Sequence, residues 1–324
     1  MPGLFVKPAN AILSGFSWAR SSITRKPFVA GMPSAVSVEL TNHCNLECPE
    51  CHAGSGTIKR EKGFMNLSLY SKIISELKPY IFNVNLYFQG EPMMHPHFFA
   101  FLKEEGMRKV VSTNGHFLNA ENCMKLALSS LSEIIVSLDG TTAETYKIYR
   151  KGGDFEQVLT GLKLLSEAIK SSGSSLRLRI QFLVHRHNEH QVPEVKRLAR
   201  ELNASLHLKS MQIMNYESID YWMPSSERFR RYKRLNGTWR IKSSLPDRCS
   251  RIWFNPVITW NGLVLPCCFD KDADYVMGDL KTDTFRDIWN GTKFRAFRKS
   301  ILTGRRMTDI CRNCTSGLPA YISC

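Results

Sequence analysis

Seven of the ten cysteines fall into two groups whose internal spacing suits metal binding. The first group has the pattern C-x3-C-x2-C and consists of Cys44, Cys48 and Cys51. Three thiolates on one loop can hold three irons of a cubane cluster and leave the fourth iron open to a small molecule. A closed zinc site would need a fourth ligand, which His43 or His52 could supply.

The second group lies near the C-terminus and consists of Cys249, Cys267, Cys311 and Cys314. Four thiolates can ligate a 4Fe–4S cluster completely, or they can make a four-thiolate zinc site. The sequence Trp260-Asn261-Gly262 predicts a hairpin turn between the first two ligands. Cys268 is an alternate ligand, Cys324 is the last residue of the chain, and Cys123 is expected in the core of the protein.

The composition is that of a folded chain in a reducing compartment. Close cysteine spacing in a chain of 324 residues without a secretory signal argues against a disulfide framework and favours a cytoplasmic protein. No apolar run is long enough to predict a transmembrane helix. The net charge of +15 favours acidic partners such as phosphates, nucleic acid or anionic lipid, without deciding among them.

The N-terminal residues 1–35 form a basic amphipathic segment. Residues 1–38 contain no Asp or Glu and carry four basic side chains, Lys7, Arg20, Arg25 and Lys26. One helical face collects Leu4, Phe5, Ala9, Ile12, Leu13 and Phe16. We expect a helix that packs on the domain; membrane-surface contact by residues 1–26 and a transit peptide are the alternatives.

The elements that must position the first cysteine group alternate between strand and helix. Strands are expected over residues 35–40, 82–88, 109–112, 133–138, 176–184 and 205–210. Helices are expected over residues 67–80, 97–106, 120–130, 155–171 and 189–202, with Asp154 as N-cap and Gly173 as C-terminal stop of the fourth. Six such units predict an α/β fold, a partial (β/α)6 barrel over residues 36–215.

The alternation ends near residue 215. Residues 216–248 are expected to form a basic linker with some helix, in which Arg228–Arg240 interleaves basic and aromatic side chains as a solvated helical stretch. Residues 249–324 form a short segment rich in cysteine and turn residues, which predicts a separate small domain.

Polar motifs follow the expected strands, so all of them should lie at the C-terminal face of the sheet, where barrel enzymes assemble their active sites. These motifs are Gln89-Gly90-Glu91-Pro92, Ser112-Thr113-Asn114-Gly115, Ser137-Leu138-Asp139-Gly140, Arg150 and the segment Leu183–Asn188. Taken one at a time, most of them would be read as turns, and Arg150 as a surface residue.

Together, the cysteine pattern and these motifs resemble the radical S-adenosylmethionine superfamily over residues 36–210. The resemblance implies that the open iron is chelated by S-adenosylmethionine, which is cleaved to a 5′-deoxyadenosyl radical. It assigns Gln89, Gly90 and Glu91 to the cofactor's ammonium group, although Gln89 replaces a family glycine. It assigns Ser112, Asn114, Ser137 and Asp139 to the ribose and carboxylate pocket, Arg150 to the carboxylate, and Leu183 to adenine packing.

The C-terminal pattern resembles the auxiliary iron–sulfur domains called SPASM and twitch, and the one-cluster twitch form is the better match. The resemblance implies a second 4Fe–4S cluster, an electron donor such as flavodoxin or ferredoxin, and net oxidation or radical bond formation on an unidentified substrate, an acidic small molecule or a peptide. The alternatives are a peptide- or protein-modifying maturase, an RNA-modifying radical enzyme and a non-catalytic iron–sulfur electron carrier. No residue is singled out as a catalytic acid or base.

Overall fold

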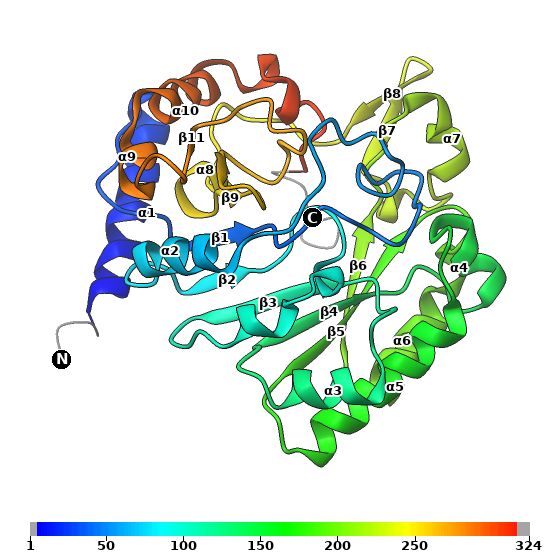
Figure 1. Cartoon of the computed structure of the whole chain (residues 1–324). Coiled ribbons are helices and arrows are strands. Elements are labelled where there is room, and N and C mark those ends of the chain that lie inside the picture. The colour runs from blue at the N-terminus through cyan, green and yellow to red at the C-terminus, as the bar shows by residue number, and fades with distance from the viewer. Residues whose placement is uncertain (1–4, 316–324) are drawn as a thin grey trace. The chain divides into compact units, whose positions relative to one another are not determined.

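The computed structural model describes residues 5–315, which divide into two compact units. The described part of unit 1 comprises residues 5–43, 59–109 and 244–314, and that of unit 2 comprises residues 44–58, 110–243 and 315. Figure 1 colours the chain from its N-terminus to its C-terminus. The chain therefore leaves unit 1 immediately before Cys44, the first cysteine of the C-x3-C-x2-C motif.

Unit 1 combines the first two strands of the α/β pattern with the cysteine-rich C-terminal region. Its α-helices and strands are α1 (Val6–Thr24), β1 (Ala35–Val38), α2 (Leu67–Leu77), β2 (Asn83–Asn85), α8 (Arg251–Phe254), β9 (Val257–Ile258), β10 (Leu263–Leu265), β11 (Gly278–Asp279), α9 (Phe285–Asn290) and α10 (Thr292–Gly304). Short 3-10 helices cover Pro92–Met94, Phe98–Leu102, Arg305–Met307 and Asp309–Cys311.

The strands of unit 1 pair in the order β11-β10-β9-β1-β2. β1 is parallel to β2 and β9, whereas β10 is antiparallel to both β9 and β11. Gly262 turns the chain between β9 and β10 at φ +92°, which confirms the hairpin expected there. The strands bury their β-branched side chains completely, among them Val36, Val38, Val84 and Val257.

Unit 2 continues the β/α alternation. Its α-helices and strands are β3 (Arg108–Thr113, of which the first two residues belong to unit 1), α3 (Ala120–Ala127), β4 (Glu133–Ser137), α4 (Ala143–Tyr149), α5 (Phe155–Ser171), β5 (Arg177–Val184), α6 (Val192–Glu201), β6 (Ser205–Ser210), α7 (Ile219–Trp222), β7 (Tyr232–Leu235) and β8 (Thr238–Ile241). β3, β4, β5 and β6 pair in chain order and are all parallel. Figure 1 shows α4, α5 and α6 on the same side of β4–β6.

All six expected strands are present, and the fold class is α/β with a mostly parallel sheet, as a partial barrel requires. Asp154 caps α5 by accepting a hydrogen bond from the Gln157 amide at 3.2 Å, as expected. The helix expected over residues 97–106 is instead a 3-10 helix, Phe98–Leu102. A single apolar turn gains too little from α-helical propagation to extend further.

The structure of residues 228–240 contradicts the helical linker that was expected there. β7 and β8 form an antiparallel hairpin joined by Asn236 and Gly237, both at positive φ. An Asn-Gly pair at positive φ matches the twist of a two-residue hairpin. Arg234 pairs with Asp220 and lies over the ring of Trp239, so the interleaved basic and aromatic side chains serve this hairpin rather than a helix.

The N-terminal helix α1 is confirmed, but it packs by the opposite face. Four polar side chains of α1 are buried, namely Asn10, Ser14, Ser17 and Ser21. Asn10 donates to the Met32 carbonyl at 3.0 Å, and the Ser14 hydroxyl donates to the same oxygen at 2.6 Å. Leu4 and Cys324 lie outside the described residues.

The expected apolar face of α1 is largely exposed, because hydrogen bonds from the opposite face hold the helix against Met32. On the apolar face, the ring of Phe16 packs edge-on against Phe28. Across residues 5–315, none of the helices combines the length and apolarity needed to cross a membrane.

Candidate functional site

The cysteine loop of unit 2 lies against an apolar cluster. Leu46 and Cys48 are buried in this cluster, which also contains Tyr149, Met211 and Trp222 from other segments of unit 2. Cys44 and Cys51 pack against the cluster but remain partly exposed. The loop is therefore anchored through its middle cysteine, while the outer two thiols face more open surroundings.

Burial raises the pKa of the Cys48 thiol to about 12, while the nearby Arg150 lowers it by less; Cys51 and Cys44 raise it further because their charges are close. The three thiols are thus near enough to influence one another electrostatically. A buried thiol of this kind releases its proton most readily when its sulfur binds a metal.

Glu50, between two of the cysteines, is a residue that sequence reasoning missed. Its buried carboxylate accepts hydrogen bonds from the Met214 amide at 2.5 Å and from the Ser218 hydroxyl at 2.6 Å. Gly54 follows the last cysteine, and a Cβ there would lie 2.6 Å from the Cys48 amide nitrogen. The contacts of Glu50 and Gly54 hold the second half of the cysteine loop in place.

Arg150 and Asp139 form a buried ion pair at the carboxyl end of β4. The guanidinium donates a hydrogen bond from Nε to Asp139 Oδ2 at 2.6 Å, and its Nη2 forms an ion pair with the same oxygen at 2.6 Å. Its Nη1 lies 3.9 Å from Cys48 Sγ. Burial alone would lower the pKa of Arg150, yet Asp139 and Cys48 hold it well above its ordinary value. The arginine therefore stays charged beside the cysteine loop.

The segment after β5 is fastened to the same aspartate. Asp139 Oδ1 accepts a hydrogen bond from the Leu183 amide at 2.6 Å. The Asn188 amide group donates to the carbonyls of Asp139 at 3.0 Å and Leu183 at 2.9 Å. Both oxygens of the Asp139 carboxylate are thus bound by groups of the protein. The carboxylate thereby positions Arg150 and Leu183.

The remaining expected residues of unit 2 also lie at strand ends. Ser112 is the penultimate residue of β3, and Ser137 is the last residue of β4. Asn114 donates to Asn45 Oδ1 at 2.7 Å, which ties the end of β3 to the cysteine loop. Sequence reasoning did not single out Asn45, because nothing in its spacing distinguishes it from a turn residue.

The Gln89-Gly90-Glu91 segment belongs to unit 1. Gly90 adopts φ +73°, and a Cβ there would lie 2.5 Å from the carbonyl oxygen of His43. The Glu91 amide donates to the same oxygen at 2.7 Å, and the buried Glu91 carboxylate accepts from the Met93 amide at 3.1 Å. This segment therefore packs against and hydrogen-bonds to His43, the residue that directly precedes Cys44 in the chain. Only glycine fits at position 90.

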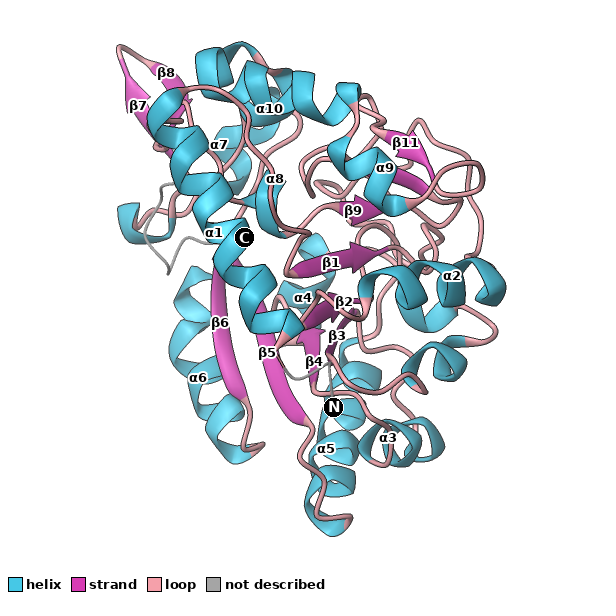
Figure 2. Cartoon of the chain, turned by 90° about the vertical axis from the view of Figure 1, so that its left-hand side faces the viewer, coloured by secondary structure: helices cyan, strands magenta, loops and turns pink. Residues whose placement is uncertain are grey.

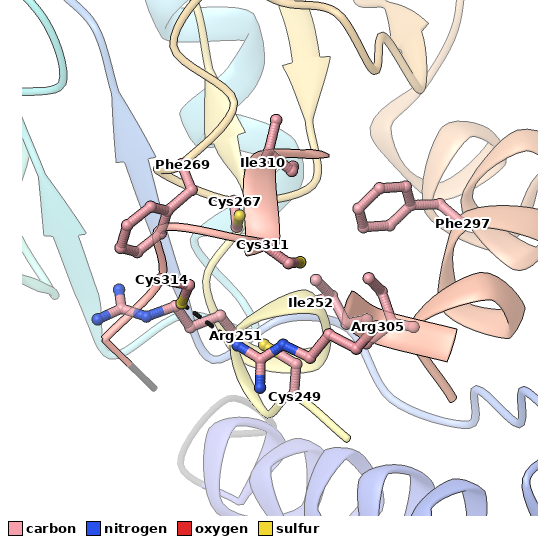
Figure 3. Close-up of a pocket in the computed structure, with 11 residues that line it drawn as sticks. Cys249, Arg251, Ile252, Cys267, Phe269, Phe297, Arg305, Ile310, Cys311 and Cys314 are labelled. Carbon is pink, nitrogen blue, oxygen red and sulfur yellow. Dashed lines mark hydrogen bonds between the residues drawn. The ribbon is translucent and has the colours of Figure 1, made fainter. Parts of the chain in front are cut away.

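The second cysteine group lines a pocket of unit 1. Cys249, Cys267, Cys311 and Cys314 are all buried around it, together with apolar side chains and the arginines Arg251 and Arg305 (Figure 3). Burial raises the pKa values of the Cys267 and Cys311 thiols. Cys268 is not part of the lining, and its sulfur lies 3.5 Å from Arg251 Nη1.

Arg305 is a second residue that the sequence did not reveal. It is completely buried, and its Nη2 lies 3.2 Å from Cys314 Sγ (Figure 3). Its other side-chain hydrogen bonds include one to the Arg248 carbonyl at 2.9 Å, and no carboxylate within residues 5–315 forms an ion pair with it. Burial alone would lower the pKa of Arg305, but Cys249, Cys314 and Cys311 raise it.

A buried cation whose neighbours are cysteine sulfurs fits an anionic metal–thiolate group in this pocket. Among residues 5–315, no three His, Cys, Asp or Glu side chains are close enough to hold one metal ion. A cubane cluster differs from a single ion because each cysteine binds a different iron.

Two proteins of known activity are similar in sequence to this chain. A mycofactocin maturase from Mycobacterium ulcerans is 32% identical over 184 residues, which are 56% of this chain and 48% of that protein. The chain spans about half the length of this relative. An S-adenosyl-L-methionine-dependent 2-deoxy-scyllo-inosamine dehydrogenase from Niallia circulans is 24% identical over 294 residues, which are 87% of this chain and 93% of that protein.

The fold is shared with solved structures of SuiB from Streptococcus suis. SuiB bound to S-adenosylmethionine has a TM-score of 0.63, with 14% identity over 87% of this chain and 72% of that chain. SuiB bound to the precursor peptide SuiA has a TM-score of 0.64, with 14% identity over 91% and 73%. At 14% sequence identity, this similarity establishes a shared fold and nothing about the reaction.

The partial barrel and the two cysteine groups define an enzyme that uses iron–sulfur clusters. The model of the radical SAM superfamily matches residues 38–199, and the model of the SPASM iron–sulfur cluster-binding domain matches residues 249–315. The first match covers 162 of 324 residues, so the chain belongs to the radical SAM superfamily. Its cofactors are 4Fe–4S clusters and S-adenosylmethionine.

The substitution Arg150→Ala should lower the free energy of unfolding by about 3–5 kcal/mol, because it leaves the buried Asp139 carboxylate without its partner. Urea denaturation of the reconstituted protein under anaerobic conditions measures this. The control is Arg177→Ala, which removes a half-exposed partner of Glu133 and should cost less than about 1 kcal/mol. Equal losses in the two variants would contradict the buried-pair argument.

The substitution Arg305→Gln should make the reduction potential of the auxiliary cluster more negative, since the reduced cluster carries the extra negative charge that the guanidinium stabilises. A redox titration followed by electron paramagnetic resonance measures this. Arg306→Gln is the matched control, because the Arg306 side chain is exposed and donates to the Ser244 carbonyl. A potential that shifts equally in both variants would rule out a specific effect of Arg305.

Proposed function

We propose that this radical SAM enzyme carries out a net oxidation of its substrate, with an auxiliary 4Fe–4S cluster as electron acceptor. The observation that carries the proposal is the pocket of unit 1, in which Cys249, Cys267, Cys311 and Cys314 surround one space. Four thiolates leave no iron open for a substrate, so electron transfer is the role that remains for such a cluster.

The first cluster and S-adenosylmethionine would supply a 5′-deoxyadenosyl radical that abstracts a hydrogen atom. In this proposal the substrate loses one hydrogen atom, one proton and one electron, which together amount to a two-electron oxidation. The chain's own part is to hold and shield the reacting groups. Cys44, Cys48 and Cys51 bind the first cluster, and Arg150, positioned by Asp139, keeps a positive charge beside it.

The proposed cofactor contacts follow the motifs described above. Gln89, Gly90 and Glu91 would hold the ammonium group of S-adenosylmethionine, with Glu91 as the charged acceptor. Ser112, Asn114 and Ser137 would line the ribose and carboxylate pocket, and Leu183 would pack on adenine. Because Asp139 already binds Arg150 and the Leu183 amide, we assign it the positioning of these two residues.

Oxidation of a hydroxyl carbon in a small polar molecule is favoured by the similarity to the inosamine dehydrogenase, which extends over 87% of this chain. A second candidate is a maturase that forms a bond or oxidises a side chain in a peptide. The mycofactocin maturase supports this candidate by its higher identity of 32%, although over only 56% of the chain.

An anaerobic assay distinguishes the two candidates. The reconstituted enzyme is incubated with S-adenosylmethionine, a reductant and either polyhydroxylated amines or peptides, and mass spectrometry follows 5′-deoxyadenosine and product. A small-molecule product that is two hydrogens lighter than its substrate would support the dehydrogenase. Product formed only from peptides would support the maturase, and no 5′-deoxyadenosine under any condition would contradict both.

Anaerobic reconstitution should yield about eight irons and eight sulfides per chain, since three plus four cysteines would hold two 4Fe–4S clusters. Cys48→Ala should lose about half of this iron and all S-adenosylmethionine cleavage. Iron and sulfide analysis with the 5′-deoxyadenosine assay measures both. Cys123→Ala is the control, because Cys123 is buried in α3 and belongs to neither group. Stoichiometric zinc in place of iron would contradict the assignment.

Cys311→Ala should uncouple the reaction. The variant should retain cleavage of S-adenosylmethionine without substrate, because the two ligand sets share no residue, and it should fail to complete oxidation of the substrate. Comparing 5′-deoxyadenosine with product in one sample measures the uncoupling, and circular dichroism with the remaining iron content checks that the protein is folded. Product at the wild-type rate from a folded variant that lacks the second cluster would refute the electron-acceptor role.

A further inference from the structure

The outer face of α1 is apolar although the helix is already packed on unit 1. Phe5, Ile12, Phe16 and Ile23 follow one another at intervals of seven, four and seven residues, so they fall on one line of the helix. Their exposed fractions are 77%, 72%, 55% and 81%. Eighteen residues separate the two ends of this line, which is about 27 Å at 1.5 Å per residue.

The buried side of α1 leaves no freedom to turn this face inward. Asn10 exchanges hydrogen bonds with Met32 in both directions, at 2.8 and 3.0 Å. Gly31 lies so close that a Cβ there would be 2.5 Å from Ser14 Oγ. Rotating the helix would replace these buried hydrogen bonds with apolar side chains and leave the Met32 backbone groups unpaired.

Basic side chains accompany the apolar line. Arg20 and Lys26 are exposed, and the first acidic residue of the chain is Glu39. The Lys299 ammonium donates to the Arg25 carbonyl at 3.1 Å, which brings a further cation from α10 to the C-terminal end of α1. Figure 2 shows α1 with one long side toward the viewer.

We propose that α1 docks on the surface of a membrane that contains anionic lipids, with Phe5, Ile12, Phe16 and Ile23 inserted at the headgroup boundary. An exposed apolar stripe on a helix with basic residues and no acidic ones is the pattern of a helix that lies in the membrane interface. Cations near the surface of such a membrane each add about 1 kcal/mol of attraction. The inference does not depend on the reaction proposed above.

Charge favours lipid over a second copy of the chain. In a two-fold antiparallel pairing of α1, the end that carries Arg20 and Lys26 would meet the end of the other helix that carries Lys7, and the helix offers no acidic side chain to compensate. Anionic headgroups provide that compensation along the whole helix. Dimerisation and binding to a protein remain outcomes that the experiment distinguishes.

The test is cosedimentation of the reconstituted full-length enzyme with vesicles of phosphatidylcholine alone or mixed with phosphatidylglycerol. Binding to the anionic vesicles is expected, and it should weaken at least tenfold in Ile12→Ser/Phe16→Ser/Ile23→Ser. Arg20→Gln/Lys26→Gln should weaken it by about tenfold or more. The effect of the charge substitutions should shrink at neutral vesicles and with added salt.

The control variant is Leu128→Ser/Met307→Ser, which removes two exposed apolar side chains elsewhere and should bind anionic vesicles like the unaltered enzyme. All variants should form 5′-deoxyadenosine at unchanged rates, which shows that they are folded. Equal binding by the α1 variants and the unaltered enzyme would overturn the proposal. So would a dimer in sedimentation velocity without lipid that the triple variant abolishes, because the apolar face would then be a self-association surface.

Discussion

Thiolates that bind iron carry negative charge, and Cys48 and the four C-terminal ligands are buried, so the fold must supply a compensating positive charge near each group. In unit 2 the compensating group is Arg150, whose Nη1 lies 3.9 Å from Cys48 Sγ. In unit 1 it is Arg305, whose Nη2 lies 3.2 Å from Cys314 Sγ. Coulomb attraction of this kind is strong in a low-dielectric interior, but a buried guanidinium must itself be held by further polar contacts.

The two arginines are held in different ways, and this difference follows from their surroundings. Arg150 is paired with the carboxylate of Asp139, which sits at the end of a strand and also binds the Leu183 amide. Arg305 is held by backbone carbonyls and thiols. A metal–thiolate group in the unit 1 pocket would therefore complete the charge balance of Arg305, whereas Arg150 already has a carboxylate partner.

The parallel strands explain why motifs that are far apart in sequence act together in unit 2. β3, β4 and β5 run in the same direction, so Asn114, Asp139 and Leu183 emerge at one edge of the sheet. Hydrogen bonds then connect this edge to the cysteine loop through Asn45 and Arg150. The cysteine spacing gives a cluster its ligands, and the strand ends give the loop its place.

The sequence by itself determined the features that depend on local spacing and periodicity. These are the C-x3-C-x2-C loop, the four C-terminal cysteines, the β/α alternation and the Asp154 cap, since each depends on residues close along the chain. The prediction from sequence was wrong for residues 228–240, where the Asn236-Gly237 turn favours a hairpin and Tyr232 is buried. Only the tertiary structure showed that Arg305 and Glu50 are buried polar anchors, because their partners are distant in sequence or are backbone atoms. It alone decided which face of α1 is covered, because the hydrogen bonds of Asn10 and Ser14 to Met32 outweigh the pull of an apolar stripe that periodicity would place in the core.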